Sequence, residues 1–178
     1  MTDITQKGVQ IIDDNARTVS TGGMVLTNTL TFTGDGATVA TPLFHVTGTV
    51  QVLGLWGVVT TALENHTAAH WRLNDQGAQV DITKASGTTL TNMTAGSVIV
   101  KKGLAGAALS LLDNAAGKVS EPTTLETIFF SPFVAVKKTG AVTDIEYSYT
   151  TSDSPTSGAI QFFVNWIPVS ADGNLEAA

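Results

Sequence analysis

Residues 24–33 alternate strictly between two kinds of side chain, and this pattern restricts the fold more than any other feature of the sequence. One set is almost entirely apolar and the other is mostly threonine: Met24, Leu26, Asn28, Leu30 and Phe32 against Val25, Thr27, Thr29, Thr31 and Thr33. Successive side chains of a β-strand point to opposite faces, whereas those of an α-helix repeat every 3.6 residues. The segment therefore predicts a strand with one face buried and the other in solvent.

The composition extends this prediction to the rest of the chain. About one residue in six is threonine, whereas Lys, Arg, Asp and Glu together make up 13% of the 178 residues. β-Branched residues favour sheets and are weak helix formers. The charged fraction is about half of the ~25% that is typical of a soluble domain. So low a fraction indicates a surface that is partly covered by partners.

Ten segments with strand character follow one another from residue 24, separated by residues typical of turns. They are 24–33, 37–47, 49–63, 69–75, 78–84, 97–102, 107–113, 127–137, 142–150 and 158–169. We expect an all-β fold, an antiparallel β-sandwich of jelly-roll type over residues 23–178, with an immunoglobulin-like sandwich as the alternative. The helix candidates are short: part of residues 1–22, and residues 62–69.

Residues 1–22 are expected to form an N-terminal arm outside the sandwich. The segment ends at Gly22 and is followed by Gly23, and glycines leave the backbone flexible. Val9, Ile11 and Ile12 are apolar, and so short an arm cannot bury them by itself. We therefore expect a partner, or the flank of the domain, to cover part of the arm.

Several segments are apolar on both faces. In the run 49–63, apolar residues occupy both alternating sets. Gly54 and Gly57 lie on either side of Trp56, and because glycine has no side chain, they indicate close packing of the backbone or a β-bulge. Residues 129–133 and 162–166 likewise place aromatic side chains on both faces. Because a one-sided sheet buries only one set, the other set must meet a second layer or another subunit.

The charge of the chain argues against nucleic-acid binding. The net charge is −6, and only Lys101-Lys102 and Lys137-Lys138 occur as basic pairs, whereas sequence-independent binding needs clustered cations. We interpret the pairs as protection of strand edges. The chain has no cysteine, no apolar stretch long enough to span a membrane and no apolar core of a signal peptide near its N-terminus. We expect it to be made in a cytoplasm.

The strongest candidate for a metal site is a pair of histidines. His66 and His70 are four residues apart with Glu64 nearby, so on a helix both could share a metal ion. A zincin motif needs Glu directly after the first His, and here that residue is Thr67. We interpret both histidines as ordinary polar loop residues, whose replacement would leave metal content and stability nearly unchanged, and we predict no metal site.

No catalytic set is apparent, and we predict that the protein is not an enzyme. His45 lies between apolar neighbours and is expected on a partly covered strand face, and the chain has no Gly-x-Ser-x-Gly elbow. The carboxylates available for acid–base work fall in turns, in the arm or in alternating strands, where a solvated carboxylate is the default. They are Asp13, Asp14, Asp81, Glu121, Glu126, Asp144 and Glu146.

Two stretches of the sequence carry a resemblance to a known family. Residues 42–62 read PLFHVTGTVQVLGLWGVVTTA, and residues 158–173 read GAIQFFVNWIPVSADG. The first resembles the opening of small virion proteins of tailed bacteriophages, with a Phe-x-Val-x-Gly strand entry and a Gly-x-Val-Thr-Thr-like phrase. The second resembles their ending, an aromatic strand closed by Pro and then Asp-Gly. The resemblance spans residues 42–173, is specific at these two ends, and leaves residues 1–22 without a counterpart.

The resemblance implies a capsid decoration, or cement, protein. Such proteins bind the outer surface of the phage head, commonly as homotrimers, and brace the subunits of the major capsid protein. On this reading the protein is made in the host cytoplasm, resides on the exterior of the virion, and binds no cofactor, nucleic acid or membrane. The alternatives are another virion component, such as a head fibre or tail protein, and a carbohydrate-binding sandwich that stacks Trp56, Trp71 or Trp166 on sugar.

Overall fold

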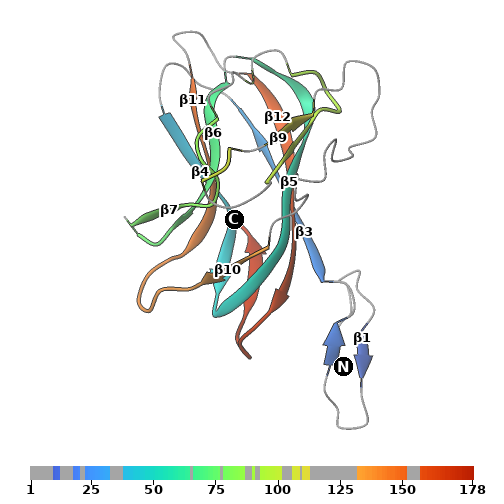
Figure 1. Ribbon diagram of the computed structural model, residues 1–178, viewed down its shortest axis with the longest axis vertical. Helices are drawn as coiled ribbons and strands as arrows, with labels where there is room; N and C mark the ends of the chain where they lie inside the picture. The colour runs from blue at the N-terminus through green and yellow to red at the C-terminus, as the bar shows by residue number, and fades with distance from the viewer. Residues whose placement is uncertain are drawn as a thin grey trace.

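The structure is a computed structural model in which two antiparallel sheets face each other (Figure 1). It describes residues 10–12, 18–20, 23–32, 38–64, 66–76, 78–86, 90, 93–101, 106–108, 110–112, 132–151 and 157–178. For residues 10–12, 18–20, 38, 110–112 and 151 only the backbone is described. All the regular structure in these ranges is β, which confirms the expected all-β class.

The first sheet has six strands. Its order is β3-β12-β5-β8-β9, and β10 pairs with β5 beside β8. The bounds are β3 (Met24–Thr31), β12 (Ser157–Pro168), β5 (Thr49–Glu64), β8 (Val98–Val100), β9 (Ser110–Leu112) and β10 (Phe133–Val136). Residues 24–31 of the alternating segment thus form β3. Met24, Leu26, Asn28 and Leu30 are less exposed than the set that alternates with them, as the pattern predicts.

The second sheet has five strands in the order β13-β4-β11-β6-β7. The bounds are β13 (Asn174–Ala177), β4 (Thr38–Thr47), β11 (Asp144–Thr151), β6 (His66–Asn74) and β7 (Gln79–Asp81). The prediction of a helix over residues 62–69 is wrong, because residues 62–64 form the end of β5 and residues 66–69 the start of β6. Their local helix propensity is overridden by pairing with β12 and β11 in the two sheets.

The antiparallel pairs of the two sheets are nested along the chain. The innermost pair is β6 with β7, followed outward by β5 with β8, β4 with β11 and β3 with β12. The pairs belong alternately to the five-stranded and the six-stranded sheet. The chain is therefore a long two-stranded ribbon that is rolled up, and further pairs, β12 with β5 and β11 with β6, join its turns.

The core lies between the two sheets and is rich in aromatic side chains. Its largest fully buried members come from both layers: Trp71, Trp166, Tyr147, Phe44 and Phe162. Burial of each is worth about 1.5–3 kcal/mol relative to exposure. Gly57 faces this core, and a Cβ atom there would lie 2.7 Å from Ile160 Cγ2. The close packing expected around Trp56 is thus confirmed on the inner side of β5.

A third, two-stranded sheet precedes the sandwich. β1 (Gln10–Ile12) pairs with β2 (Thr18–Ser20) in antiparallel register. In Figure 1 this hairpin lies beyond the end of β3, outside the two facing sheets. Several sequence predictions fall outside the described residues, namely those for Val9, Asp13, Asp14, Glu121, Glu126 and residues 127–131.

Candidate functional site

The strands of the two sheets differ sharply in charge. Among the strands of the six-stranded sheet, the only ionisable residue is Glu64, at the last position of β5. Tyrosines aside, the strands of the five-stranded sheet carry eight: His45, His66, His70, Arg72, Asp81, Asp144, Glu146 and Glu176. Over the described strands, the outer face of the six-stranded sheet is therefore uncharged apart from the end of β5, whereas the outer face of the five-stranded sheet is rich in ion pairs.

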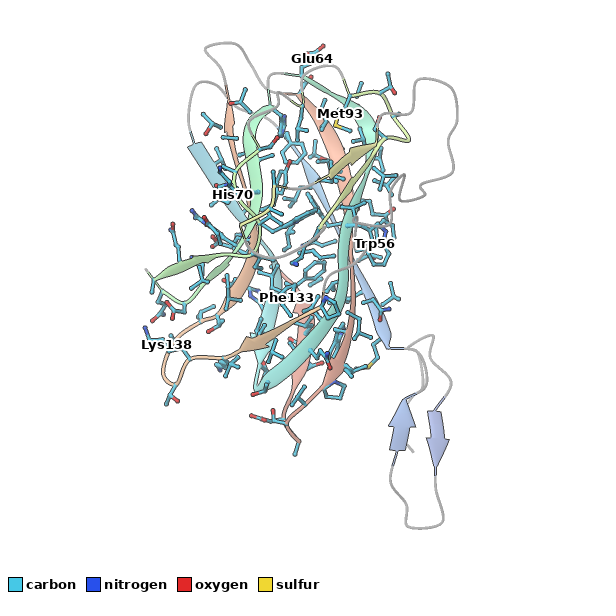
Figure 2. The ribbon with its side chains drawn as sticks, viewed as in Figure 1. Trp56, Glu64, His70, Met93, Phe133 and Lys138 are labelled. Carbon is cyan, nitrogen blue, oxygen red and sulfur yellow. The ribbon has the colours of Figure 1, made fainter. Side chains whose placement is uncertain are left out.

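The uncharged outer face is built around a pair of stacked rings. Trp56 on β5 and Phe163 on β12 are direct cross-strand neighbours, and their rings are 5.3 Å apart and inclined by 3°. Figure 2 shows Trp56 on the side of β5 that points away from the five-stranded sheet. Stacked aromatic pairs add about 0.5–1.5 kcal/mol beyond the burial of their area, so this pair gives the face a rigid centre.

Exposed valines extend the apolar surface around these rings. Val134 and Val136 on β10 are 56% and 55% exposed, and Val25 on β3 is 49% exposed. Val134 pairs with Gln51 and Val136 with Thr49, so both valines share the outer face of β5. We call Val25, Trp56, Val134, Val136 and Phe163 the apolar face. Apolar side chains gathered on one surface are typical of protein interaction sites.

A cross-strand ion pair joins β6 and β11 on the outer face of the five-stranded sheet. Arg72 Nε donates to Glu146 Oε2 at 2.8 Å, and Asn74 Nδ2 donates to Glu146 Oε1 at 2.7 Å. The Glu146 side chain is only 5% exposed. Burial of a carboxylate costs free energy unless charged and polar partners compensate it, and both partners here come from β6. Sequence reasoning missed Arg72 and Asn74, although they alternate with the apolar residues Trp71 and Leu73.

A second buried carboxylate on this face, that of Asp144, forms a hydrogen bond with a histidine. His45 Nδ1 lies 2.6 Å from Asp144 Oδ1, and these residues are neighbours in the register of β4 and β11. The prediction that the carboxylates are solvated is therefore wrong for Asp144 and Glu146, because both are buried beside partners. It holds for Asp81, whose side chain is 61% exposed. His45 lies on a strand, as expected.

The interpretation of His66 and His70 as loop residues is wrong, because both lie on β6. Ala68 between them has a positive φ of 50°, and the register with β11 shifts there. This irregularity sends the two histidines to different sides of the sheet. His66 packs in the core against Phe32 and Tyr149, with ring centroids 4.4 Å apart in each case. His70 instead lies 3.9 Å from Asp81 on the outer face. The two imidazoles therefore cannot share one metal ion.

His66 is part of a buried aromatic cluster with unsatisfied polar atoms. Its Nδ1 donates to the Glu64 carbonyl oxygen at 3.2 Å, and burial lowers the pKa of His66 from its ordinary value of 6.5 to about 4. Among the described residues, His66 Nε2, Trp71 Nε1 and Tyr147 Oη find no hydrogen-bond partner. Because His66 is fully buried, we now expect its truncation to cost stability, contrary to the interpretation from the sequence.

The tryptophans that a carbohydrate site would need are mostly inaccessible. Trp71 is 0% and Trp166 is 1% exposed, so neither can stack on a sugar. Trp56 is half-buried, with Phe163 parallel to its ring. Of the three tryptophans, only Trp56 reaches the molecular surface.

The described ranges hold neither a metal cluster nor a membrane-spanning helix. No group of three or more His, Asp or Glu side chains within them is arranged to hold a metal ion. Nor do these ranges contain a helix with the length and apolar character needed to cross a bilayer.

Comparison with known proteins gives no relative from which a role could be transferred. No protein-family model, no curated protein and no solved structure matches the chain at a significant level.

Proposed function

We propose that the protein is a viral structural protein, a capsid decoration protein that binds the outer surface of a tailed-phage head as a homotrimer and stabilises the major capsid protein. The observation that carries this proposal is the apolar face of the six-stranded sheet, with its stacked Trp56 and Phe163 and its exposed Val25, Val134 and Val136. The proposed role is structural and not enzymatic.

The physical character of this face supports docking on another protein. An interface must give up its water, and burial of an unpaired charge costs several kcal/mol. The strands of the six-stranded sheet carry no ionisable residue except Glu64 at the end of β5, so the apolar face can be desolvated without that cost. The stacked rings supply the kind of rigid aromatic group that is enriched at the centres of interfaces.

The nested pairing of the strands supports a jelly roll as the finer description of the fold. The sheets β3-β12-β5-β8 and β4-β11-β6-β7 each alternate strands from the two halves of the ribbon. Jelly rolls of this kind build many viral capsid domains, as well as lectins. The nested order thus agrees with the resemblance of residues 42–62 and 158–173 to phage virion proteins.

A binding assay with variants that place a charge on one or the other sheet tests the proposal. Purified protein is mixed with phage heads that lack a decoration protein, and the bound fraction is measured by co-sedimentation. Val134→Asp should weaken attachment at least tenfold, because it places a charge in the desolvated apolar face. Val80→Asp is the matched control, since Val80 is 61% exposed on β7 of the other sheet.

The outcomes separate the candidate functions. No attachment of the unaltered protein to heads would refute a role in decoration. Attachment to tails or fibres instead would favour another virion component. Binding to a glycan array that is lost in Trp56→Ala would favour the carbohydrate-binding alternative. Equal weakening by both valine substitutions would refute the apolar face as the docking surface.

A further inference from the structure

β3 is a long strand at the edge of the six-stranded sheet. It pairs with β12 on one side, and no other described strand pairs with it. The pairing runs through eight consecutive residues without a register shift, from Met24 with Trp166 to Thr31 with Ala159. β3 is therefore regular along its whole length, which is the geometry that a further strand needs.

The register shows which backbone groups of β3 point away from β12. Phe32 N donates to the Gly158 oxygen at 2.9 Å, so the backbone groups of Phe32 point toward β12. Along an antiparallel strand these groups point alternately to the two sides. The amides and carbonyls of Thr27, Thr29 and Thr31 therefore point toward the free edge, as do those of Val25.

This edge lacks the features by which proteins usually block strand addition. Edge strands are commonly short, or carry charged residues, proline or a bulge. β7 and β9 have three residues each, β13 has four and carries Glu176, and β10 has four and is followed by Lys137 and Lys138. β3 has eight residues, with no charge and no proline. It is the one long unprotected edge among the described strands.

A strand-forming segment of the same chain directly precedes β3. The β1–β2 hairpin has two free edges, since each of its strands pairs only with the other among the described strands. Gly23 directly precedes β3 with a φ of +68°, and a side chain there would collide with Asn165. Figure 1 shows the hairpin beyond the end of β3 of the same copy and not beside it.

We propose that the free edge of β3 in one copy receives the β1–β2 hairpin of a neighbouring copy. The added strands would extend the six-stranded sheet across the subunit boundary through the outward backbone groups of Thr27 and Thr29. A contact of this kind joins two different surfaces, and three such contacts close into a ring. The inference rests on the proposed homotrimer, and it names the contact that holds the trimer together.

Two changes remove this contact in different ways. Thr29→Pro deletes an amide that points to the free edge and leaves the hydrogen bonds between β3 and β12 in place, as is tolerated on edge strands. Deletion of residues 1–22 removes the hairpin instead. Light scattering should give the mass of a trimer for the full chain and for Thr29→Val, which keeps the amide. It should give the mass of a monomer for Thr29→Pro and for the chain without residues 1–22. Circular dichroism should show an intact sandwich in all four.

Three results would overturn the inference: a monomeric full chain, a trimer that survives both changes, or a Thr29→Val chain that falls apart as Thr29→Pro does. If Thr29→Pro fails to fold, the deletion alone decides, because it leaves β3 unaltered. All measurements are made on the free protein, so the binding of the full chain to phage heads still tests the proposed function separately.

Discussion

His66 shows how one residue can tie the stability of the sandwich to pH. The imidazole is fully buried, touches the rings of Phe32 and Tyr149, and has no partner for Nε2 among the described residues. Protonation would place a charge in this apolar setting, and burial accordingly lowers the pKa of His66 to about 4. In the folded protein the ring is therefore neutral at physiological pH.

The first prediction at this scale concerns acid stability. The unfolded chain binds a proton at His66 below about pH 6.5, whereas the folded chain binds it only below about pH 4. The free energy of unfolding should therefore fall by roughly 3 kcal/mol through this group as the pH falls from 6.5 to 4, and should not change through it outside that window. Urea denaturation at several pH values measures the fall.

His66→Phe is the informative variant, since it keeps a ring in the cluster and removes the titration. Between pH 6.5 and 4, the free energy of unfolding of this variant should fall by roughly 3 kcal/mol less than that of the unaltered protein. If both proteins lose the same free energy of unfolding over this range, burial of a neutral His66 is wrong.

At the scale of the element, β5 is the strand on which the six-stranded sheet depends. It pairs with β12, β8 and β10, and its inner residues line the core. The same strand carries Trp56 on the apolar face, so close packing on one side fixes the position of the surface aromatic on the other. Gly57 makes that packing possible, because Ile160, Ile99 and Phe162 occupy the space where its side chain would be.

The prediction for β5 is that Gly57→Ala destabilises the fold by about 1–3 kcal/mol, as overpacking of a core does. The added Cβ would lie 2.7 Å from Ile160 Cγ2 and 3.2 Å from Phe162 Cδ1. Gly106→Ala is the matched control, since no atom lies within 4 Å of a Cβ placed there. Thermal melts compare the two. Equal melting temperatures for Gly57→Ala and the unaltered protein would contradict the proposed packing.

At the scale of the whole molecule, the rolled ribbon sorts charge between the two faces. Successive strands such as β3, β4, β5 and β6 belong in turn to the six-stranded and the five-stranded sheet. Almost all the ionisable strand residues lie on the five-stranded sheet. The strands on the six-stranded side carry no charged side chain except Glu64 at the end of β5. A partner on the five-stranded side instead meets a charged surface, on which Asp81 and Glu176 are exposed. The face that docks therefore determines how attachment responds to salt.

The prediction at this scale is that head attachment changes less than about twofold between about 0.05 and 0.5 M salt, because salt screens charge and leaves apolar contacts in place. Equilibrium binding at several salt concentrations measures this. A loss of affinity of tenfold or more over that range would place the docking surface on the charged five-stranded sheet and would contradict our proposal for the apolar face.

The sequence alone determined those features that depend on neighbouring residues. The period of two over residues 24–33 predicted β3 and which of its faces is less exposed. The glycines on either side of Trp56 predicted the close packing at Gly57. Backbone alternation and the size of a side chain are local properties, so they can be read from the order of the residues. The all-β class followed from the same local preferences, summed over the chain.

The tertiary structure decided what depends on residues far apart in the chain. Glu146 is buried because Arg72, 74 positions earlier, pairs with it across β11 and β6, and no local pattern encodes that distance. Residues 62–64 and 66–69 lie in strands because pairing with β12 and β11 outweighed a weak helical preference. The irregularity at Ala68 separated His66 from His70. The uncharged and the charged face likewise exist only after the ribbon is rolled, since strand order in the sheets assigns each strand to a face.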